Sequence, residues 1–118
     1  NNINVGFYYN PPKNYINIST KIITNKKILK KIKKIYFIPT KHNVYNKYIS
    51  KEKINKDDYN YLKRNYEKLG IEVVDLTNVL TFSAEERLKK NQFVYWKDDT
   101  HWNKWGIISA MKYISENL

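Results

Sequence analysis

The stretch "KIYFIPTKH", residues 34–42, decides the fold that we expect for this chain. Its β-branched and aromatic residues 35–38 are stopped by Pro39, a pattern typical of a buried strand that ends in a loop. A second run of the same kind, "IEVVDL" at residues 71–76, predicts another short strand. The segment between them is long enough for the crossover that parallel strands require.

A helix is predicted between these two strands. Its apolar residues share one helical face, and they are Tyr59, Leu62, Tyr66 and Leu69. Asp57 or Asp58 can cap the start of this helix, and Gly70 suits its C-terminal end. A strand, helix and strand of these lengths form a βαβ unit with parallel strands and an almost always right-handed crossover. The sequence therefore predicts an α/β fold.

The chain before the first predicted strand is harder to interpret. Residues 21–34, "KIITNKKILKKIKK", place Ile22, Leu29 and Ile32 near one helical face, which favours an amphipathic helix that covers the sheet. The alternative is a basic segment that lies on a membrane or binds nucleic acid. Further upstream, "INVGFYY" at residues 3–9 is compatible with a strand that the prolines of "NPPKN" end.

Three further elements are predicted after the second strand. Ser83 and Glu86 form a capping-box pattern for a short helix through Lys90. The stretch "QFVYW", residues 92–96, predicts a third strand. Asn103 can cap a final helix. The apolar stripe of that helix consists of Ile107, Met111, Ile114 and Leu118.

Polar residues follow all three predicted strands. If the strands are parallel, "PTKHN" (39–43), "DLTN" (75–78) and "KDDTHWN" (97–103) lie at one edge of the sheet, which would bring Lys41, Asp75 and His101 together. Open α/β sheets bind ligands at this edge, where a helix N-terminus can also support an anion. A functional site is therefore expected there.

Length and composition set the broad class. We assign residues 1–118 to a single domain with a modest core, and residues 1–20 to an N-terminal segment of unassigned structure. The chain has no cysteine, which excludes disulfides, thiolate metal sites and cysteine nucleophiles. It shows neither a transmembrane run nor the pattern of a signal peptide.

The formal charge of +11 and the pI near 9.7 are typical of proteins with a polyanionic partner. However, Lys, Asn, Ile and Tyr supply 62 of the 118 residues, and all four have AT-rich codons. We therefore favour genome composition as the source of the basicity. The lysines do not interleave with aromatic residues in any nucleic-acid-binding signature, so no nucleic-acid partner is expected.

The stretch "YWKDDTHWNKWG", residues 95–106, carries the densest chemistry of the chain. An imidazole beside a carboxylate is a general base, because the carboxylate fixes the ring tautomer and stabilises the imidazolium. His101 can pair with Asp99, two residues earlier, or with Asp98, three residues earlier. In the purely structural alternative, Asp99 caps the turn and His101 is a hydrogen-bonded surface residue. Trp102 and Trp105 then anchor the last helix in the core.

The two polar stretches together resemble the SGNH hydrolase-like domain of the alginate O-acetyltransferase family. They are "YFIPTKHNVYNKYI" at residues 36–49 and "DTHWNKWG" at residues 99–106. In that family a Pro-Thr-Lys loop, a helix, a Val-Val-Asp-Leu-like strand and an Asp-Thr-His-Trp turn with a downstream Gly follow in this order. The resemblance covers about residues 30–118. It implies a three-layer, flavodoxin-like α/β fold with a parallel sheet, of which this chain would be a part.

The resemblance also implies a reaction. Asp99 and His101 match the acid and base of a Ser-His-Asp triad that moves an acetyl group to a cell-surface polysaccharide through an acetyl-serine intermediate. The usual SGNH spacing would select Asp98 instead. In the family the nucleophilic serine follows this pair in a Gly-Asp-Ser-like turn, and no serine of this chain has that context. We therefore expect the nucleophile outside the chain, and no activity from the chain alone.

Further expectations follow from the same resemblance. Lys41, Thr40 and Trp102 would bind substrate. The partners would be a polysaccharide acceptor, an acetyl donor and membrane-associated export or acetyl-transfer machinery, in an extracytoplasmic location. No cofactor is implied.

Two alternatives stay open. One is a non-catalytic glycan-binding or interaction module on the same fold. The other is a metal site, for which the chain offers nitrogen and oxygen ligands in His42, Asp75, Asp99 and His101. These four lack a recognisable ligand spacing, so no metal is expected.

Overall fold

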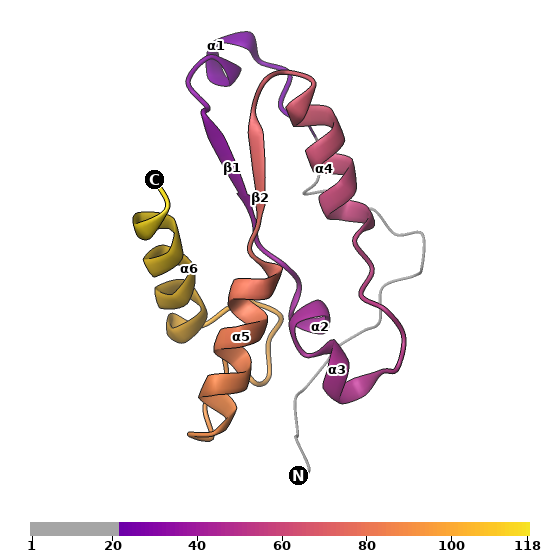
Figure 1. The fold of residues 1–118 in the computed structure, drawn as a ribbon, viewed down its shortest axis with the longest axis vertical. Helices are drawn as coiled ribbons and strands as arrows, with labels where there is room; N and C mark the ends of the chain where they lie inside the picture. Colours follow the sequence, from indigo (N-terminus) through magenta and orange to yellow (C-terminus); the bar gives the residue numbers. More distant parts are fainter. Residues whose placement is uncertain (1–21) are drawn as a thin grey trace. The chain divides into compact units, whose positions relative to one another are not determined.

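The computed structural model describes residues 22–118, and the strand considered at residues 3–9 lies outside them (Figure 1). The described residues form two compact units. We call residues 22–37 and Asn55–Asp75 the strand unit, and Ile38–Ile54 with Leu76–Leu118 the helical unit. The assignment of residues 1–118 to one domain stays a prediction. Among residues 22–118, no helix combines the length and apolar character needed to cross a membrane.

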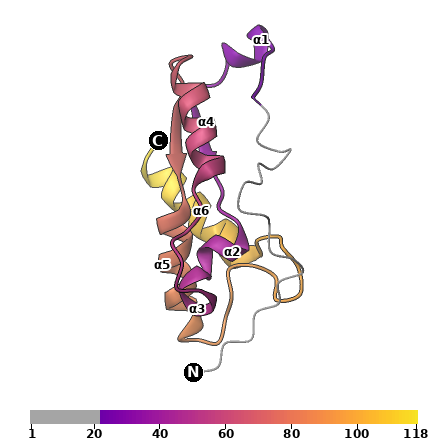
Figure 2. The same cartoon turned by 90° about the vertical axis from the view of Figure 1, so that its right-hand side faces the viewer.

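The strand unit contains the predicted βαβ arrangement. Strands β1 (Lys34–Phe37) and β2 (Glu72–Asp75) are parallel, with Lys34 opposite Glu72 and Phe37 opposite Asp75. Helix α4 (Asp57–Glu67) precedes β2 and runs beside it (Figure 2). Because parallel neighbours need a crossover and α4 forms part of it, the predicted α/β class is confirmed.

The core of the strand unit joins the helix to the sheet. It is formed by Tyr66, Ile71 and Val73, and the apolar residues around it are Ile22, Leu29, Ile32, Ile35, Phe37, Tyr59 and Leu62. The predicted apolar face of α4 is therefore confirmed for three of its four residues. Leu69 is 53% exposed, because α4 ends at Glu67 and the helical spacing no longer applies to it.

The ends of α4 follow the prediction only in part. Neither Asp57 nor Asp58 is the N-cap: the N-cap is Lys56, and the two carboxylates lie in the first turn, where the helix dipole favours negative charge. The side chain of Asn55 accepts the Asp57 N–H at 2.8 Å. Gly70 follows the helix with a φ of 78°, so the predicted glycine stop is confirmed.

The helix predicted over residues 21–34 is wrong in extent. Within residues 22–34 only α1 (Lys26–Leu29) forms, with Asn25 as its N-cap. The Asn25 side chain accepts the N–H groups of Lys27 and Ile28 at 3.0 and 3.2 Å. The three apolar residues chosen from the helical pattern still pack on the strand unit's core, but loop segments on either side of α1 bring two of them there.

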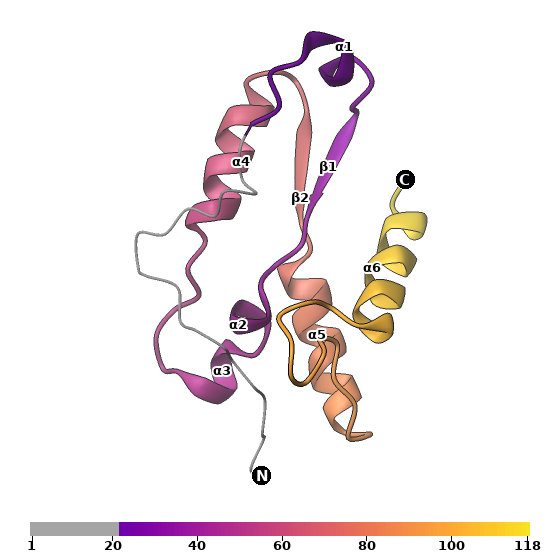
Figure 3. The same cartoon turned by 180° about the vertical axis from the view of Figure 1, so that it is seen from behind.

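The helical unit consists of α2 (Lys41–Val44), α3 (Asn46–Ile49), α5 (Thr77–Leu88) and α6 (Lys104–Glu116). Helices α5 and α6 pack against each other (Figure 3). The buried cluster of this unit includes Val44, Tyr45, Leu80, Ala84, Val94 and Tyr95. Its members come from α2, α5 and the segment before α6, so this core ties the three together.

Two predictions for this region are wrong. Ser83 does not cap a helix, because α5 begins at Thr77 and Ser83 lies inside it, with its Oγ 2.6 Å from Ser109 Oγ on α6. Residues 92–96 form no strand. Of these five residues only Tyr95 takes part in a β-bridge, which is an isolated antiparallel bridge to Trp102. Residues 97–103 therefore follow no strand of the parallel sheet, and the premise for placing them at its edge is wrong.

Helix α6 confirms one prediction and corrects another. Asn103 is its N-cap, as expected. The apolar stripe is not the buried face, since Ile107, Met111 and Leu118 are 40%, 50% and 94% exposed. The helix instead buries its small residues, Gly106 and Ala110, which permit close approach to its neighbours.

Candidate active site

The residues predicted to carry the chemistry lie on a tight loop, residues 95–102, which we call the site loop. Its base is closed by backbone hydrogen bonds, because Trp96 N–H donates to His101 O at 2.9 Å and Asn103 N–H donates to Val94 O at 3.0 Å. Both bonds join the two chain segments that enter and leave the loop. The segment that looked like a strand therefore pairs with its own continuation and not with β1 or β2.

Asn103 joins the site loop to the start of α6. Its side-chain Nδ2 donates to Phe93 O at 2.7 Å and to Tyr95 O at 3.2 Å. Its Oδ1 accepts the N–H groups of Trp105 and Gly106 at 3.0 and 3.3 Å. One amide therefore caps the helix and holds the strand-like segment before the loop.

Gly106 is required where α6 meets this segment. A Cβ on Gly106 would lie 2.3 Å from Val94 O and 3.2 Å from Trp102 Cβ. The first contact is with a backbone atom that already accepts the closing bond of the site loop. Only glycine allows α6 to start this close to the loop base.

Lys41 holds the site loop from the start of α2. Its Nζ donates to the backbone oxygens of Trp96, Lys97 and Asp99 at 2.9, 2.8 and 3.0 Å. Three carbonyls match the three N–H donors of an ammonium group. The side chain is only 3% exposed, and this burial lowers the pKa of Lys41, while the charges of Asp98 and Asp99 oppose the shift.

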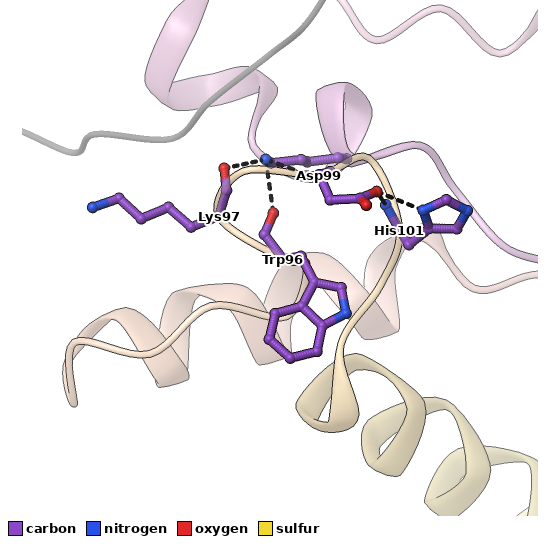
Figure 4. A network of polar contacts seen from close by, with 5 residues as sticks. Trp96, Lys97, Asp99 and His101 are labelled. Atoms are coloured by element: carbon purple, nitrogen blue, oxygen red, sulfur yellow. Dashed lines mark hydrogen bonds and ion pairs between the residues drawn. The ribbon is translucent and has the colours of Figure 1, made fainter.

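Asp99 and His101 form a direct pair at the tip of the loop. One carboxylate oxygen, Asp99 Oδ1, lies 2.5 Å from His101 Nδ1 and accepts the His101 backbone N–H at 2.9 Å. The pKa of Asp99 is lowered, first by the backbone N–H of His101 and then by its ring. In Figure 4 the second ring nitrogen faces away from the carboxylate. The geometry thus pairs His101 with Asp99, and no described contact joins it to Asp98.

The pair is open to solvent. The side chains of His101 and Asp99 are 78% and 52% exposed. Water weakens the interaction of two charges, so the carboxylate acts on the imidazole mainly through the short hydrogen bond that orients it. A ring held in this way can take a proton from a hydroxyl group that approaches its free nitrogen.

The other predicted site residues have structural places. Thr40 is the N-cap of α2 and accepts the Asn43 N–H at 3.2 Å. Trp102 is half-buried against the core of the helical unit. Asp75 ends β2 in the strand unit, where Lys56 Nζ lies 3.9 Å from its carboxylate. In residues 22–118, no three or more His, Asp or Glu side chains are arranged to hold a metal ion.

The serines of the described chain make contacts elsewhere. Ser83 and Ser109 bond to each other, and Ser109 also donates to Trp105 O at 2.9 Å. Ser115 donates to Lys112 O, and Ser50 accepts the Glu52 N–H. Within residues 22–118, no serine contacts His101. Ser19 lies outside the described residues.

Two buried tyrosines complete the support of the loop, and the sequence analysis missed them. Tyr45 Oη accepts the Val94 N–H at 3.0 Å, and burial raises the pKa of Tyr45 to about 12. Tyr95 Oη donates to Pro39 O, and burial raises its pKa as well. Among 11 tyrosines nothing in the sequence marks these two. Gly106 could have been noticed in the sequence. The chain has only 3 glycines, and one of them lies in the first turn of a helix, where glycine is otherwise unfavourable.

A comparison with protein families gives one finding. The model of the family described as "SGNH hydrolase-like domain, acetyltransferase AlgX" matches residues 34–118. The matched range begins at β1 and includes Lys41, the site loop and α6. Neither the comparison with curated proteins nor that with solved structures gives a match.

Proposed function

The chain belongs to the family of SGNH hydrolase-like domains of the acetyltransferase AlgX, and from this premise we propose that Asp99 and His101 are the acid–base pair of an O-acetyltransferase or acetylesterase. The observation that carries the proposal is the contact of Asp99 Oδ1 with both the ring and the backbone N–H of His101. This double contact fixes the ring tautomer and orientation, which is the task of the aspartate in a Ser-His-Asp triad.

In the proposed reaction His101 Nε2 takes the proton of a serine hydroxyl while the serine Oγ attacks an acetyl carbonyl. The bond between the acetyl carbon and the donor oxygen breaks, and the imidazolium returns its proton to that leaving oxygen. A hydroxyl group of the acceptor, or water, then attacks the acetyl-serine and gives its proton to His101. The bond between the acetyl carbon and serine Oγ breaks, and the imidazolium returns the proton to that Oγ, which regenerates the serine. A polysaccharide acceptor in an extracytoplasmic location remains part of the proposal.

The serine belongs to a segment beyond the described residues in this proposal. Each of the described serines has a contact of its own away from His101. The open position of the His101 ring leaves room for a hydroxyl supplied by another segment. A covering segment would also exclude water, which strengthens the electrostatic effect of Asp99 on the ring.

Lys41 acts as a positioning residue in this mechanism. We expected it to bind substrate, together with Thr40 and Trp102. Its three carbonyl contacts instead favour a role in holding the loop that carries the pair. Thr40 remains a candidate for substrate contact through its exposed side, because capping α2 uses its hydroxyl only as an acceptor.

The test is acetyl-ester hydrolysis by a protein that contains this chain together with the proposed serine segment. His101→Ala should lower turnover of an aryl acetate by several orders of magnitude, and Asp99→Ala by a factor of up to about ten thousand. Asp98→Ala is the matched control, since Asp98 does not contact His101, and it should leave most of the turnover. Circular dichroism checks that each variant is folded. Equal losses in the Asp98 and Asp99 variants would overturn the assignment of the acid.

A non-catalytic glycan-binding module is the second candidate. It is favoured by the solvent exposure of the pair and by the absence of a serine contact among residues 22–118. The two functions differ in one measurement. A serine-reactive organophosphate should label the protein stoichiometrically if a triad forms, and His101→Ala should abolish labelling. A glycan-binding module would stay unlabelled and would bind oligosaccharide equally well with and without His101.

A further inference from the structure

Lysines are concentrated in one part of the strand unit. Residues 22–37 contain six lysines and no Asp or Glu, so they carry six of the chain's net eleven positive charges. AT-rich codons explain a high number of lysines. They do not explain this arrangement, because all 11 Asp and Glu residues lie in residues 52–116 and, within the acid-free residues 1–51, residues 22–37 are the richest in lysine. The clustering therefore needs a physical cause.

The structure exposes most of these lysines together. Five are exposed and lie on α1 or just beyond it, and we call them the lysine tip: Lys26, Lys27, Lys30, Lys31 and Lys33. The sixth, Lys34, lies 3.6 Å from the carboxylate of Glu72. No ion pair to a described acidic residue involves the lysine tip. Its charge therefore faces solvent uncompensated.

Aliphatic side chains accompany this charge. Ile28 lies within the lysine tip and is 48% exposed, and Ile23 is 36% exposed. The turn from α4 to β2 lies at the same end of the strand unit and adds Lys68 and Leu69, which is 53% exposed (Figures 1 and 2). Exposed isoleucine and leucine side chains are unfavourable in water. They suit a partner surface whose outer layer is negatively charged and whose layer beneath is apolar.

The residue types distinguish between possible partners. Single-stranded nucleic acid is bound through aromatic stacking platforms and arginine, and residues 22–33 contain neither an aromatic residue nor an arginine. Oligosaccharide platforms would likewise use aromatic rings. Lysines around exposed aliphatic side chains match the requirements of an anionic bilayer, where the ammonium groups meet the headgroups and the aliphatic groups reach the acyl boundary.

We propose that the lysine tip docks the protein on the surface of an anionic phospholipid membrane. The segment lies on the surface and does not span it, since α1 has only four residues. Each lysine near an anionic leaflet contributes about 1 kcal/mol, so the tip supplies a usable affinity at about 0.1 M salt. This inference is independent of the proposed acetyl transfer.

The experiment is co-sedimentation of the chain with vesicles. Vesicles of phosphatidylcholine with phosphatidylglycerol should retain the protein, and vesicles of phosphatidylcholine alone should not. Lys27→Glu/Lys31→Glu should lower the partition coefficient by about thirtyfold or more, the equivalent of two lysine contributions. The matched control is Lys51→Glu/Lys53→Glu, which makes the same change in net charge at two exposed lysines of the helical unit and should have a much smaller effect.

Two further arms separate lipid docking from simple charge attraction. Ile28→Ser leaves the charge unchanged and should lower binding about fivefold if the aliphatic group enters the acyl boundary. Duplex DNA serves as a soluble polyanion, and its binding should respond equally to both double variants. The proposal is overturned if Lys27→Glu/Lys31→Glu and Lys51→Glu/Lys53→Glu lose vesicle binding equally. It is also overturned if Lys27→Glu/Lys31→Glu selectively weakens DNA binding while the acidic vesicles retain neither the parent chain nor this variant.

Discussion

The strand unit and the site loop acquire their structures in different ways. In the strand unit the local pattern largely agrees with the result: β1, α4 and β2 form where apolar periodicity and a glycine stop indicate them. The site loop has a strand-like sequence in residues 92–96, yet it forms a closed turn. Its shape depends on Lys41, Tyr45 and Gly106, which lie outside it.

This difference shows how the site loop is held in the helical unit. Backbone groups at a strand end can be satisfied by a neighbouring strand, by side chains or by water. Here the buried ammonium of Lys41 satisfies three carbonyls of the loop. The backbone hydrogen bonds that close the loop base satisfy some of the other backbone groups. Substitutions at these supports should therefore disturb the loop more than comparable substitutions disturb the strand unit.

The largest effect is expected from Gly106→Ala. The new Cβ would lie 2.3 Å from Val94 O, a backbone atom that cannot move without opening the base of the site loop. We expect a loss of about 3 kcal/mol in the free energy of unfolding, at the upper part of the range for overpacking, despite alanine's better helix propensity. Urea unfolding measures the loss, and amide hydrogen exchange assigns it to the helical unit. Stability equal to the parent chain would show that α6 does not approach the loop this closely.

Lys41→Met should have the next largest effect. Methionine keeps the aliphatic length but leaves three loop carbonyls without their donor. An unpaired acceptor costs about 1–3 kcal/mol when buried. Because the loop residues are exposed and water can replace part of the bonds, we expect a loss of about 2 kcal/mol and faster amide exchange in residues 96–101.

Lys97→Met is the control for Lys41→Met. The Lys97 side chain is exposed, and its backbone carbonyl can still accept from Lys41. This variant should match the parent chain in stability and in loop exchange. If both methionine variants behave alike, Lys41 does not hold the loop, and the difference between the two regions would need another cause.

The same contrast explains what could be predicted from the sequence. The βαβ unit, the face of α4 and the Asn103 cap could be predicted because each depends on residues close in sequence. The Asp99–His101 contact could also be predicted, since its partners are only two positions apart in the sequence. Its catalytic role stays a prediction.

The remaining features could not be predicted because they depend on distant partners. Ser83 has the pattern of a cap, but the contact with Ser109 is possible only once α5 and α6 pack. The contacts of Lys41 with the site loop could not be predicted, because no local pattern reveals carbonyls 55 to 58 residues away. For the same reason, residues 92–96 could not be distinguished from a strand of the sheet. The expectation that Lys41 binds substrate stays a prediction.

Gly70→Ala is the counterpart of Gly106→Ala in the strand unit, and a smaller effect is expected. No atom lies within 4 Å of a Cβ added at Gly70, so the substitution costs only the strain of an L-residue at a φ of 78°. That strain is about 1 kcal/mol after the gain from a less flexible unfolded chain. Urea unfolding compares the two alanine variants directly. A loss at Gly70 as large as that at Gly106 would contradict the distinction between local strain and close packing.

The smallest effect concerns the protonation of Asp99. Its pKa is lowered below the ordinary 3.8, because the charged carboxylate accepts hydrogen bonds from His101. A lowered carboxyl pKa means that the native contact is complete above pH 3.8 and is lost as the pH falls through the folded-state pKa. The ¹³Cγ chemical shift of Asp99 in an NMR titration gives that pKa directly. The stability of the strand unit should not show the same pH dependence as this chemical shift.

Variants of the partner residue show which hydrogen bond produces this shift. His101→Ala removes the ring but keeps the backbone N–H, which is the larger cause of the lowered pKa, so the Asp99 pKa should return only part of the way to 3.8. Asp98→Asn leaves both hydrogen bonds in place and should leave the Asp99 titration largely unchanged. A complete return in His101→Ala would mean that the ring alone holds the carboxylate. The turn would then not orient the pair before a substrate arrives, and the backbone of the site loop would lose its part in fixing the geometry.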